Sequence, residues 1–140
     1  MMTAATLDLS MIGEGDGTAD LQSTFEEFCE RNGVPRKAAM QVMLALEELV
    51  VNTKLYGFPE GGDRRVDLHV QVDGRELICD VVDGGIAFDP FTEAPPPDLS
   101  NPTAERRVGG LGVHIVKRTM DQVSYQRDGD HNRVRLTKRF

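Results

Sequence analysis

The stretch Leu46-Glu47-Glu48-Leu49-Val50-Val51-Asn52 decides how the rest of this 140-residue chain is interpreted. It lies near the end of a segment that the sequence predicts as a long helix from about Pro35 to Leu55. Proline suits a first helical turn, and Gly57 follows as a helix breaker. At about 100° per residue, one arc of this helix is apolar and should face a core. The arc consists of Ala39, Val42, Met43, Leu46, Leu49, Val50 and Thr53.

A narrow polar stripe, formed by Gln41, Glu48 and Asn52, runs along the opposite side of the same helix. Its borders are again apolar: Leu44, Val51 and Leu55 on one side and Ala45 on the other. Because the helix is apolar around most of its circumference, we expect other elements to cover it on both sides.

Glu48 and Asn52 are four residues apart, so they share one helix face and can reach the same ligand. A carboxylate and a carboxamide on a half-buried face suit two tasks in phosphoryl transfer: a base or water-orienting group, and an oxygen ligand for Mg²⁺. Taken alone, this pair is so common in helices that a solvated stripe is the simpler interpretation.

Length and composition predict one domain, residues 1–140, in a reducing compartment. No apolar run could span a membrane, and no secretory signal is visible. The cysteines, Cys29 and Cys79, have no metal-binding spacing and form no disulfide framework. We therefore expect a cytoplasmic location. The net charge of −7 argues against direct nucleic-acid binding and fits a protein that meets other proteins.

The remaining pattern predicts a strand, two helices, a hairpin, an irregular segment, a helix and a second hairpin. The expected bounds are 6–10, 19–31, 35–55, 66–72 with 76–82, about 84–108, 110–120, and 123–126 with 133–140. Because strands and helices are segregated, the sequence predicts an α+β fold with two layers. An irregular segment as long as 84–108 is typical of a functional lid or of disorder, and we favour a lid.

Two glycine-containing motifs follow the long helix. Asp83 ends a buried strand before Gly84-Gly85, where the backbone can approach a planar ligand and a carboxylate can accept the amino protons of adenine. Alone, this motif is more simply a turn after a strand. Gly109-Gly110-Leu111-Gly112 opens a helix, and free N–H groups there can hold an anion. It is neither a Walker A loop nor a dinucleotide fingerprint, because Gly-Lys-Ser/Thr and a strand-helix-strand unit are missing.

Together the three motifs resemble the N, G1 and G2 boxes of the GHKL ATPase superfamily. Within it, the chain is similar to the small bacterial anti-sigma factor serine/threonine kinases of the RsbW and SpoIIAB type. The boxes are Glu48 to Asn52 with Tyr56-Gly57, Asp83-Gly84-Gly85 with Phe88-Asp89-Pro90, and Gly109 to Val116. The resemblance covers nearly the whole chain. It implies a two-layer sandwich of the Bergerat type, with a mixed, mostly antiparallel sheet and helices on one face.

The resemblance also implies ATP and Mg²⁺ as cofactors and assigns a role to each motif. Glu48 would be the general base or water-orienting group, and Asn52 the Mg²⁺ ligand. Asp83 would bind adenine, and Gly85 would let the purine approach. The remaining implied nucleotide contacts are Gly109, Gly110, Leu111 and Gly112 at the phosphates, Arg106 and Arg107 from the closing lid, and Thr137 near the adenine.

The chain departs from the family pattern at two positions. Leu55 replaces a basic or histidine residue that often follows the N-box asparagine, and Ala87 stands where many members have a glycine. Both departures concern catalysis more than ATP binding.

The resemblance implies an ATP-Mg-dependent serine/threonine protein kinase that acts as an anti-sigma factor. Its expected partners are a STAS-type antagonist protein, which it would phosphorylate, and a sigma factor, and a homodimer is a further family expectation. The alternative is a non-catalytic module whose protein binding is gated by ATP. A sensor histidine kinase domain is disfavoured, because the chain has no room for dimerisation helices or a phosphoacceptor segment.

Overall fold

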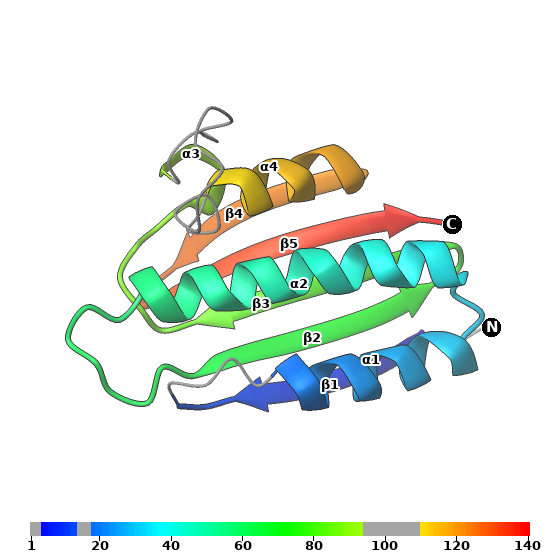
Figure 1. Cartoon of the computed structure of the whole chain (residues 1–140), viewed down its shortest axis with the longest axis horizontal. Helices are drawn as coiled ribbons and strands as arrows, with labels where there is room; N and C mark the ends of the chain where they lie inside the picture. Colours follow the sequence, from blue (N-terminus) through cyan, green and yellow to red (C-terminus); the bar gives the residue numbers. More distant parts are fainter. Residues whose placement is uncertain (1–3, 14–17, 94–109) are drawn as a thin grey trace.

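The computed structural model describes residues 4–13, 18–93 and 110–140. Its five strands are β1 (Ala5–Met11), β2 (Val66–Asp73), β3 (Glu76–Asp83), β4 (Gln122–Asp128) and β5 (His131–Arg139). Its helices are α1 (Thr18–Arg31), α2 (Arg36–Tyr56), the four-residue α3 (Pro90–Glu93) and α4 (Gly110–Thr119). The strands form one sheet in the order β1-β2-β3-β5-β4 (Figure 1). Every pairing between the described strands is antiparallel, so this sheet is not mixed.

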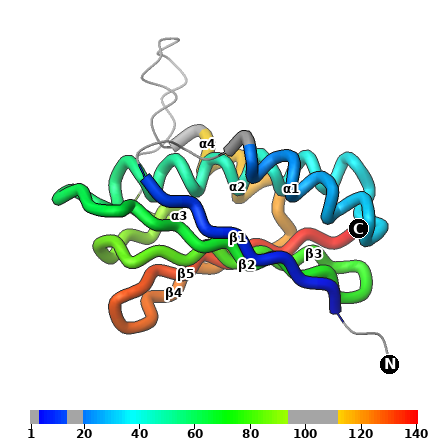
Figure 2. Tube along the Cα trace, turned by 90° about the horizontal axis from the view of Figure 1, so that it is seen from below, coloured from blue at the N-terminus to red at the C-terminus, as the bar shows by residue number. Residues whose placement is uncertain are grey.

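The helices α1, α2 and α4 form a second layer on one face of the sheet (Figure 2). In Figure 1, α1 lies over the β1 side, α2 crosses the middle, and α4 lies over the β4 side. The predicted α+β fold with two layers and helices on one face is therefore confirmed.

Tight turns join the two hairpins of the sheet. β2 alternates buried apolar residues with more exposed polar ones, which is the pattern of a strand with one covered face. Gly74 begins the two-residue turn into β3 with φ 62°, and Gly129 begins the equivalent turn between β4 and β5 with φ 58°. Both backbone conformations favour glycine, because a side chain is strained there.

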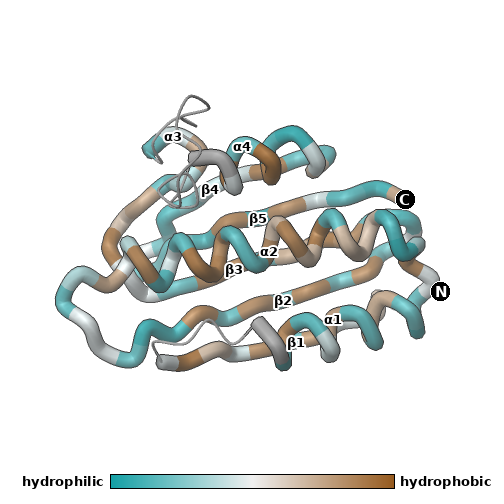
Figure 3. Tube along the Cα trace, in the orientation of Figure 1, coloured by the Kyte–Doolittle hydropathy of each residue, from teal (hydrophilic) through white to brown (hydrophobic). Residues whose placement is uncertain are grey.

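The core lies between the two layers, and the predicted apolar arc of α2 contributes to it. Figure 3 shows hydrophobic and hydrophilic stretches alternating along α2. All residues of that arc are buried except Thr53, which is half-buried. The expectation that α2 is covered on both sides is wrong for the described residues: Met40, Leu44 and Leu55 are 54%, 57% and 57% exposed. The sheet covers only the inner side of α2, and α1 and α4 pack along its flanks.

The helix α3 interrupts the stretch that was predicted to be irregular, after Asp89 accepts a hydrogen bond from the Phe91 N–H at 2.9 Å. The predicted lid beyond Glu93 lies outside the described residues. Among the residues that the structure describes, no helix is both long and apolar enough to cross a membrane.

Candidate functional site

The candidate site lies where the C-terminal half of α2 meets the end of β3, the loop that follows β3 and the first residues of β5. A small cavity of about 20 Å³ marks this place. It is lined by Leu49, Asn52, Thr53, Gly57, Asp83, Phe88, Pro90, Asn132 and Val134. A cavity of this size holds about one water molecule. The sequence-predicted Asn52 and Asp83 therefore line one cavity, although they are far apart in the chain.

Glu48 is half-buried on α2 and lies against the first turn of α4. An ideal Cβ placed on Gly112 would be 2.0 Å from Glu48 Oε2, so only a glycine leaves room for the carboxylate there. Burial raises the pKa of Glu48 above its usual value, and the neighbouring charge of Glu47 raises this pKa further. A carboxylate with a raised pKa is a better proton acceptor near neutral pH than an ordinary one.

Asn52 follows Glu48 by one helical turn and is only 4% exposed. Its Nδ2 is buried and has no hydrogen-bond partner within the described part of the chain. A buried amide without a partner costs free energy, so this position suits a bound ligand. No group of three or more His, Cys, Asp or Glu side chains among the described residues could hold a metal ion. A Mg²⁺ ion held by Asn52 would therefore depend on phosphate and water oxygens for its other ligands.

Asp83 ends β3 and is 7% exposed. Its Oδ1 accepts hydrogen bonds from the Gly85 N–H at 2.8 Å and from Asn132 Nδ2 at 3.0 Å. Both described hydrogen bonds of this carboxylate end on Oδ1. Neither of these two hydrogen bonds uses Oδ2, and the role of this carboxylate toward adenine stays a prediction.

Asn132 is a residue of the site that sequence reasoning missed. It is 3% exposed at the start of β5, directly opposite Asp83 in the sheet register. Besides Asp83, its Nδ2 donates to the Ile86 carbonyl at 2.7 Å. Its Oδ1 accepts from the Phe88 N–H at 3.3 Å and from the Tyr125 hydroxyl at 2.5 Å. Asn132 thus fixes both the carboxylate and the loop beside it, and only the strand register reveals this.

Gly85 allows the loop after β3 to approach the end of α2. An ideal Cβ on Gly85 would lie 2.4 Å from the Gly57 carbonyl oxygen, and the next residue, Ile86, donates its N–H to the same oxygen at 2.8 Å. The rings of Tyr56 and Phe88 stack beside this contact, with centroids 6.0 Å apart. In the structure Gly85 therefore serves backbone packing, and its role toward a purine stays a prediction.

The other predicted contacts fall into three groups. Gly110 and Leu111 begin α4, next to Gly112, where the helix offers free N–H groups. Arg106, Arg107 and Gly109 lie outside the described residues.

Thr137 is the third case, and the structure does not bring it to the site. The preceding residue, Leu136, belongs to the core, and successive side chains of a strand point to opposite faces. Thr137 therefore lies on the sheet face away from the helices, opposite Ile78. The prediction that Thr137 lies near the adenine is corrected accordingly, because Asn132 is the β5 residue beside Asp83.

Comparison with known proteins agrees with this arrangement of motifs. Residues 16–138 match the model of the histidine kinase-like ATPase domain family. The chain belongs to this family. The match confirms the resemblance to the GHKL ATPases that the three sequence motifs indicated, and the domain type implies ATP binding.

Curated relatives of this histidine kinase-like ATPase chain are protein kinases by name. The serine/threonine-protein kinase BtrW of Bordetella bronchiseptica is 26% identical over 94% of this chain and 91% of its own length. The serine-protein kinase RsbW of Halalkalibacterium halodurans is 26% identical over 88% of this chain and 76% of its own. These names agree with the predicted enzyme class, protein serine/threonine kinase.

Two solved structures share the fold. The histidine kinase domain of a blue-light-activated kinase from Erythrobacter litoralis superimposes with a TM-score of 0.53 at 19% identity, over 90% of this chain. The chain spans 60% of the length of that structure. The SiaB-SiaC complex from Pseudomonas aeruginosa gives a TM-score of 0.56 at 13% identity, over 94% of this chain and 89% of that one.

Proposed function

We propose that this chain is an ATP-Mg-dependent serine/threonine protein kinase that phosphorylates a STAS-type antagonist protein and acts as an anti-sigma factor. The observation that carries the proposal is the place of the Glu48 carboxylate, which lies against the first turn of α4, one helical turn from the buried Asn52 amide. The names of the curated relatives support the same reaction, phosphoryl transfer to a serine or threonine of a protein.

Each described site residue has a separate task in this reaction. Asp83 Oδ2 binds the amino group of adenine, and the N-terminus of α4 binds phosphate oxygens through its free N–H groups. Asn52 Oδ1 would hold Mg²⁺, which would supply positive charge beside the phosphate oxygens. Glu48 takes the proton of the acceptor hydroxyl while the hydroxyl oxygen forms a bond to the γ-phosphorus. The bond between the γ-phosphorus and the β-γ bridging oxygen breaks, and ADP leaves.

Nucleotide binding requires the small cavity to widen. Sites for molecules of this size are typically ~300–1,000 Å³, far more than the cavity of about 20 Å³ beside Asp83. We expect the loop after β3 to move, because it borders the cavity and carries Phe88. Its hydrogen bonds to Gly57 and Asn132 and the stacked rings of Tyr56 and Phe88 are the contacts that would have to rearrange. We expect these rings to separate when adenine enters.

The second candidate function is an ATP-gated binding module without catalysis. Leu55 favours it, because this residue is 57% exposed at a position where family members often have a basic or histidine side chain. The solved neighbour in the SiaB-SiaC complex is likewise bound to another protein. In both candidate functions residues 1–140 form one domain that works in the cytoplasm as a homodimer. Its partners are a sigma factor and an antagonist protein.

The deciding experiment is transfer of labelled γ-phosphate from ATP-Mg to a STAS-type antagonist, compared between the native chain and Glu48→Gln. ATP affinity is measured for both proteins. Phosphorylation that is lost in a variant with native ATP affinity supports the kinase. ATP binding without transfer to any antagonist supports the gated module, and absence of ATP binding contradicts both.

A further inference from the structure

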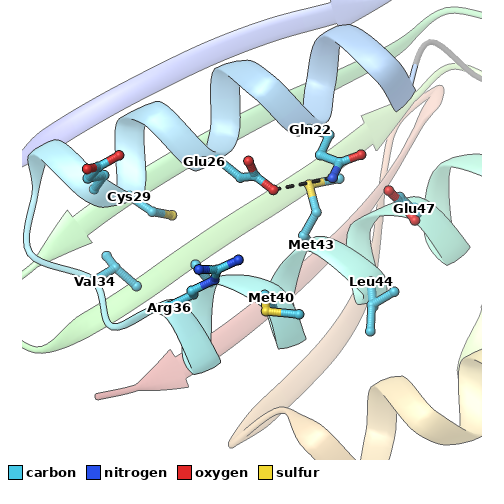
Figure 4. A pocket seen from close by; sticks show the side chains of 11 residues that line it. Gln22, Glu26, Cys29, Val34, Arg36, Met40, Met43, Leu44 and Glu47 are labelled. Atoms are coloured by element: carbon cyan, nitrogen blue, oxygen red, sulfur yellow. Dashed lines mark hydrogen bonds between the residues drawn. The ribbon is translucent and has the colours of Figure 1, made fainter.

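A groove of about 860 Å³ lies between α1 and the N-terminal half of α2 (Figure 4). None of the residues around the Asp83 cavity lines it. It therefore belongs to a different part of the surface, and neither adenine nor phosphate binding accounts for it.

The floor and one lip of the groove are apolar. Cys29 and Met43 form the floor and are 1% and 6% exposed. Met40 and Leu44 stand at the α2 lip and are 54% and 57% exposed. These two exposed apolar side chains are one helical turn apart and adjoin a buried apolar floor, an arrangement more typical of an interaction site than isolated apolar residues are, and methionines adapt to the shape of a partner.

The rim of the groove is acidic. Glu26 and Glu30 come from α1 and Glu47 from α2, whereas Arg36 is the one cationic side chain among the lining residues. Glu26 is held in place by Gln22, whose Nε2 donates to its carboxylate at 3.3 Å. An apolar floor between carboxylates is complementary to a surface that has an apolar stripe flanked by cations.

We propose that this groove binds a basic amphipathic α-helix of a partner protein. Such a helix presents apolar residues at every third and fourth position and lysines or arginines beside them. The walls suit this shape: α1 has 14 residues, which corresponds to ~21 Å and therefore to about four turns of a bound helix.

Charge excludes the other occupants of such a groove. A second copy of this chain has a net charge of −7 and would therefore bring further negative charge toward the acidic rim. Phosphates of a nucleic acid or of an anionic membrane would be repelled for the same reason. No metal-binding group of three or more His, Cys, Asp or Glu is present in the described part of the chain, so the carboxylates are not a cation site.

The test uses the full chain without nucleotide and a labelled 14-residue peptide as the probe. The peptide has leucines at helical spacing and lysines elsewhere, and its twin has glutamates in place of the lysines. Binding is measured by fluorescence anisotropy at physiological salt. We expect the lysine peptide to bind and the glutamate peptide not to bind. Equal binding of the two peptides overturns the proposal.

Matched variants separate the groove from general charge attraction. Glu26→Lys with Glu30→Lys changes the net charge as much as Glu60→Lys with Asp63→Lys, and the second pair lies in the exposed loop beyond the opposite end of α2 (Figure 1). We expect the affinity for the lysine peptide to fall about 10-fold or more in the first pair and less than about 3-fold in the second. Equal losses overturn the proposal.

A third variant tests the apolar lip. Leu44→Ser should weaken peptide binding about 10-fold and leave the circular dichroism spectrum unchanged, because Leu44 is more than half exposed. Native peptide affinity in this variant overturns the proposal. The proposal is also overturned if the native chain binds no peptide and instead forms a dimer that Leu44→Ser dissociates. Asp83→Asn should bind the peptide normally, so a failure of the nucleotide site is distinguishable from a failure of the groove.

Discussion

Gly112 and Glu48 come so close that an ideal Cβ on Gly112 would lie 2.0 Å from the Oε2 atom of Glu48. The glycine at the start of α4 therefore serves two needs at once. It leaves space for the carboxylate proposed as the base, and in the proposed site it would keep the helix N-terminus open toward a phosphate. The spacing of the glycine-rich motif predicts only the second of these needs.

Gly112→Ala should separate folding from catalysis. The Glu48 carboxylate is the end of a flexible side chain, so it can rotate away from the new methyl group, and alanine stabilises a helix by up to about 1 kcal/mol relative to glycine. Phosphoryl transfer should fall about 100-fold, because the base is displaced. Thermal unfolding and transfer of labelled phosphate measure the two effects.

The control for this prediction is the double variant with Glu48→Gln. If the methyl group acts by moving Glu48, adding Gly112→Ala to Glu48→Gln causes little further loss of transfer. A large further loss in the double variant, together with weaker ATP binding, would instead mean that the methyl group blocks the phosphate site.

Gly85→Ala should be strongly destabilising, whereas Gly84→Ala should not. A Cβ on Gly85 would meet the Gly57 carbonyl oxygen at 2.4 Å, and that oxygen belongs to the backbone and accepts the Ile86 N–H. A Cβ on Gly84 would meet only the His131 ring, at 4.0 Å. In urea unfolding, we expect the free energy of unfolding to fall by about 1–3 kcal/mol in Gly85→Ala and by less than about 0.5 kcal/mol in Gly84→Ala. Equal losses would contradict the described contact.

Asp83→Asn should weaken ATP binding and leave the fold intact. Asparagine keeps the oxygen that accepts hydrogen bonds from Gly85 and Asn132, and it has an amide NH₂ group in place of the other carboxylate oxygen. The NH₂ group cannot accept a hydrogen bond from the adenine amino group, so we expect calorimetry to show about a 10-fold or greater loss of ATP affinity. An ATP affinity equal to that of the native chain would show that adenine binds elsewhere.

Asn132→Ala should affect stability as well as binding. It removes the donor to the buried Asp83 carboxylate and the acceptor of the Phe88 N–H. Leaving buried polar groups without partners costs about 1–3 kcal/mol, to be measured by urea unfolding. ATP affinity should also fall, because the carboxylate and its loop are no longer fixed. A loss below about 0.5 kcal/mol would mean that the network contributes little.

Periodicity predicted that the two candidate residues of α2 share one face, and the glycine motifs with the family resemblance made them site candidates. Glu48 and Asn52 share a face because a helix turns through about 100° per residue, and the arc buried against the sheet follows from the same rule. The position of Asp83 at the end of a strand could be predicted from a short stretch, whereas its role toward adenine follows from the family resemblance and stays a prediction.

Features that depend on pairing between distant segments could not be predicted in this way. Asn132 lies beside Asp83 only because β5 inserts between β3 and β4 in one particular register. The same register places Thr137 on the far face of the sheet. The exposure of Leu44 and Leu55 was also missed, because the apolar circumference of a helix does not reveal which of its sides have neighbours.

The last prediction concerns pH. Burial and the charge of Glu47 raise the pKa of Glu48, so the folded chain keeps this proton at a pH where the unfolded chain, with a glutamate pKa of about 4.3, has lost it. The folded state then binds more protons, and this group's contribution to stability falls as pH rises through that window. Glu48→Gln should lack this slope in urea unfolding measured at a series of pH values. Identical slopes would contradict the raised pKa.

The same pKa sets the pH dependence of phosphoryl transfer. Glu48 accepts a proton only when it is ionised, so transfer should increase as pH rises through its raised pKa. Glu47→Gln removes the repulsion and should move this profile to lower pH, by less than the total shift because burial is the larger cause. ATP affinity measured at each pH is the control for binding. A profile that stays in place in Glu47→Gln, with unchanged ATP affinity, would mean that another group governs the proton transfer.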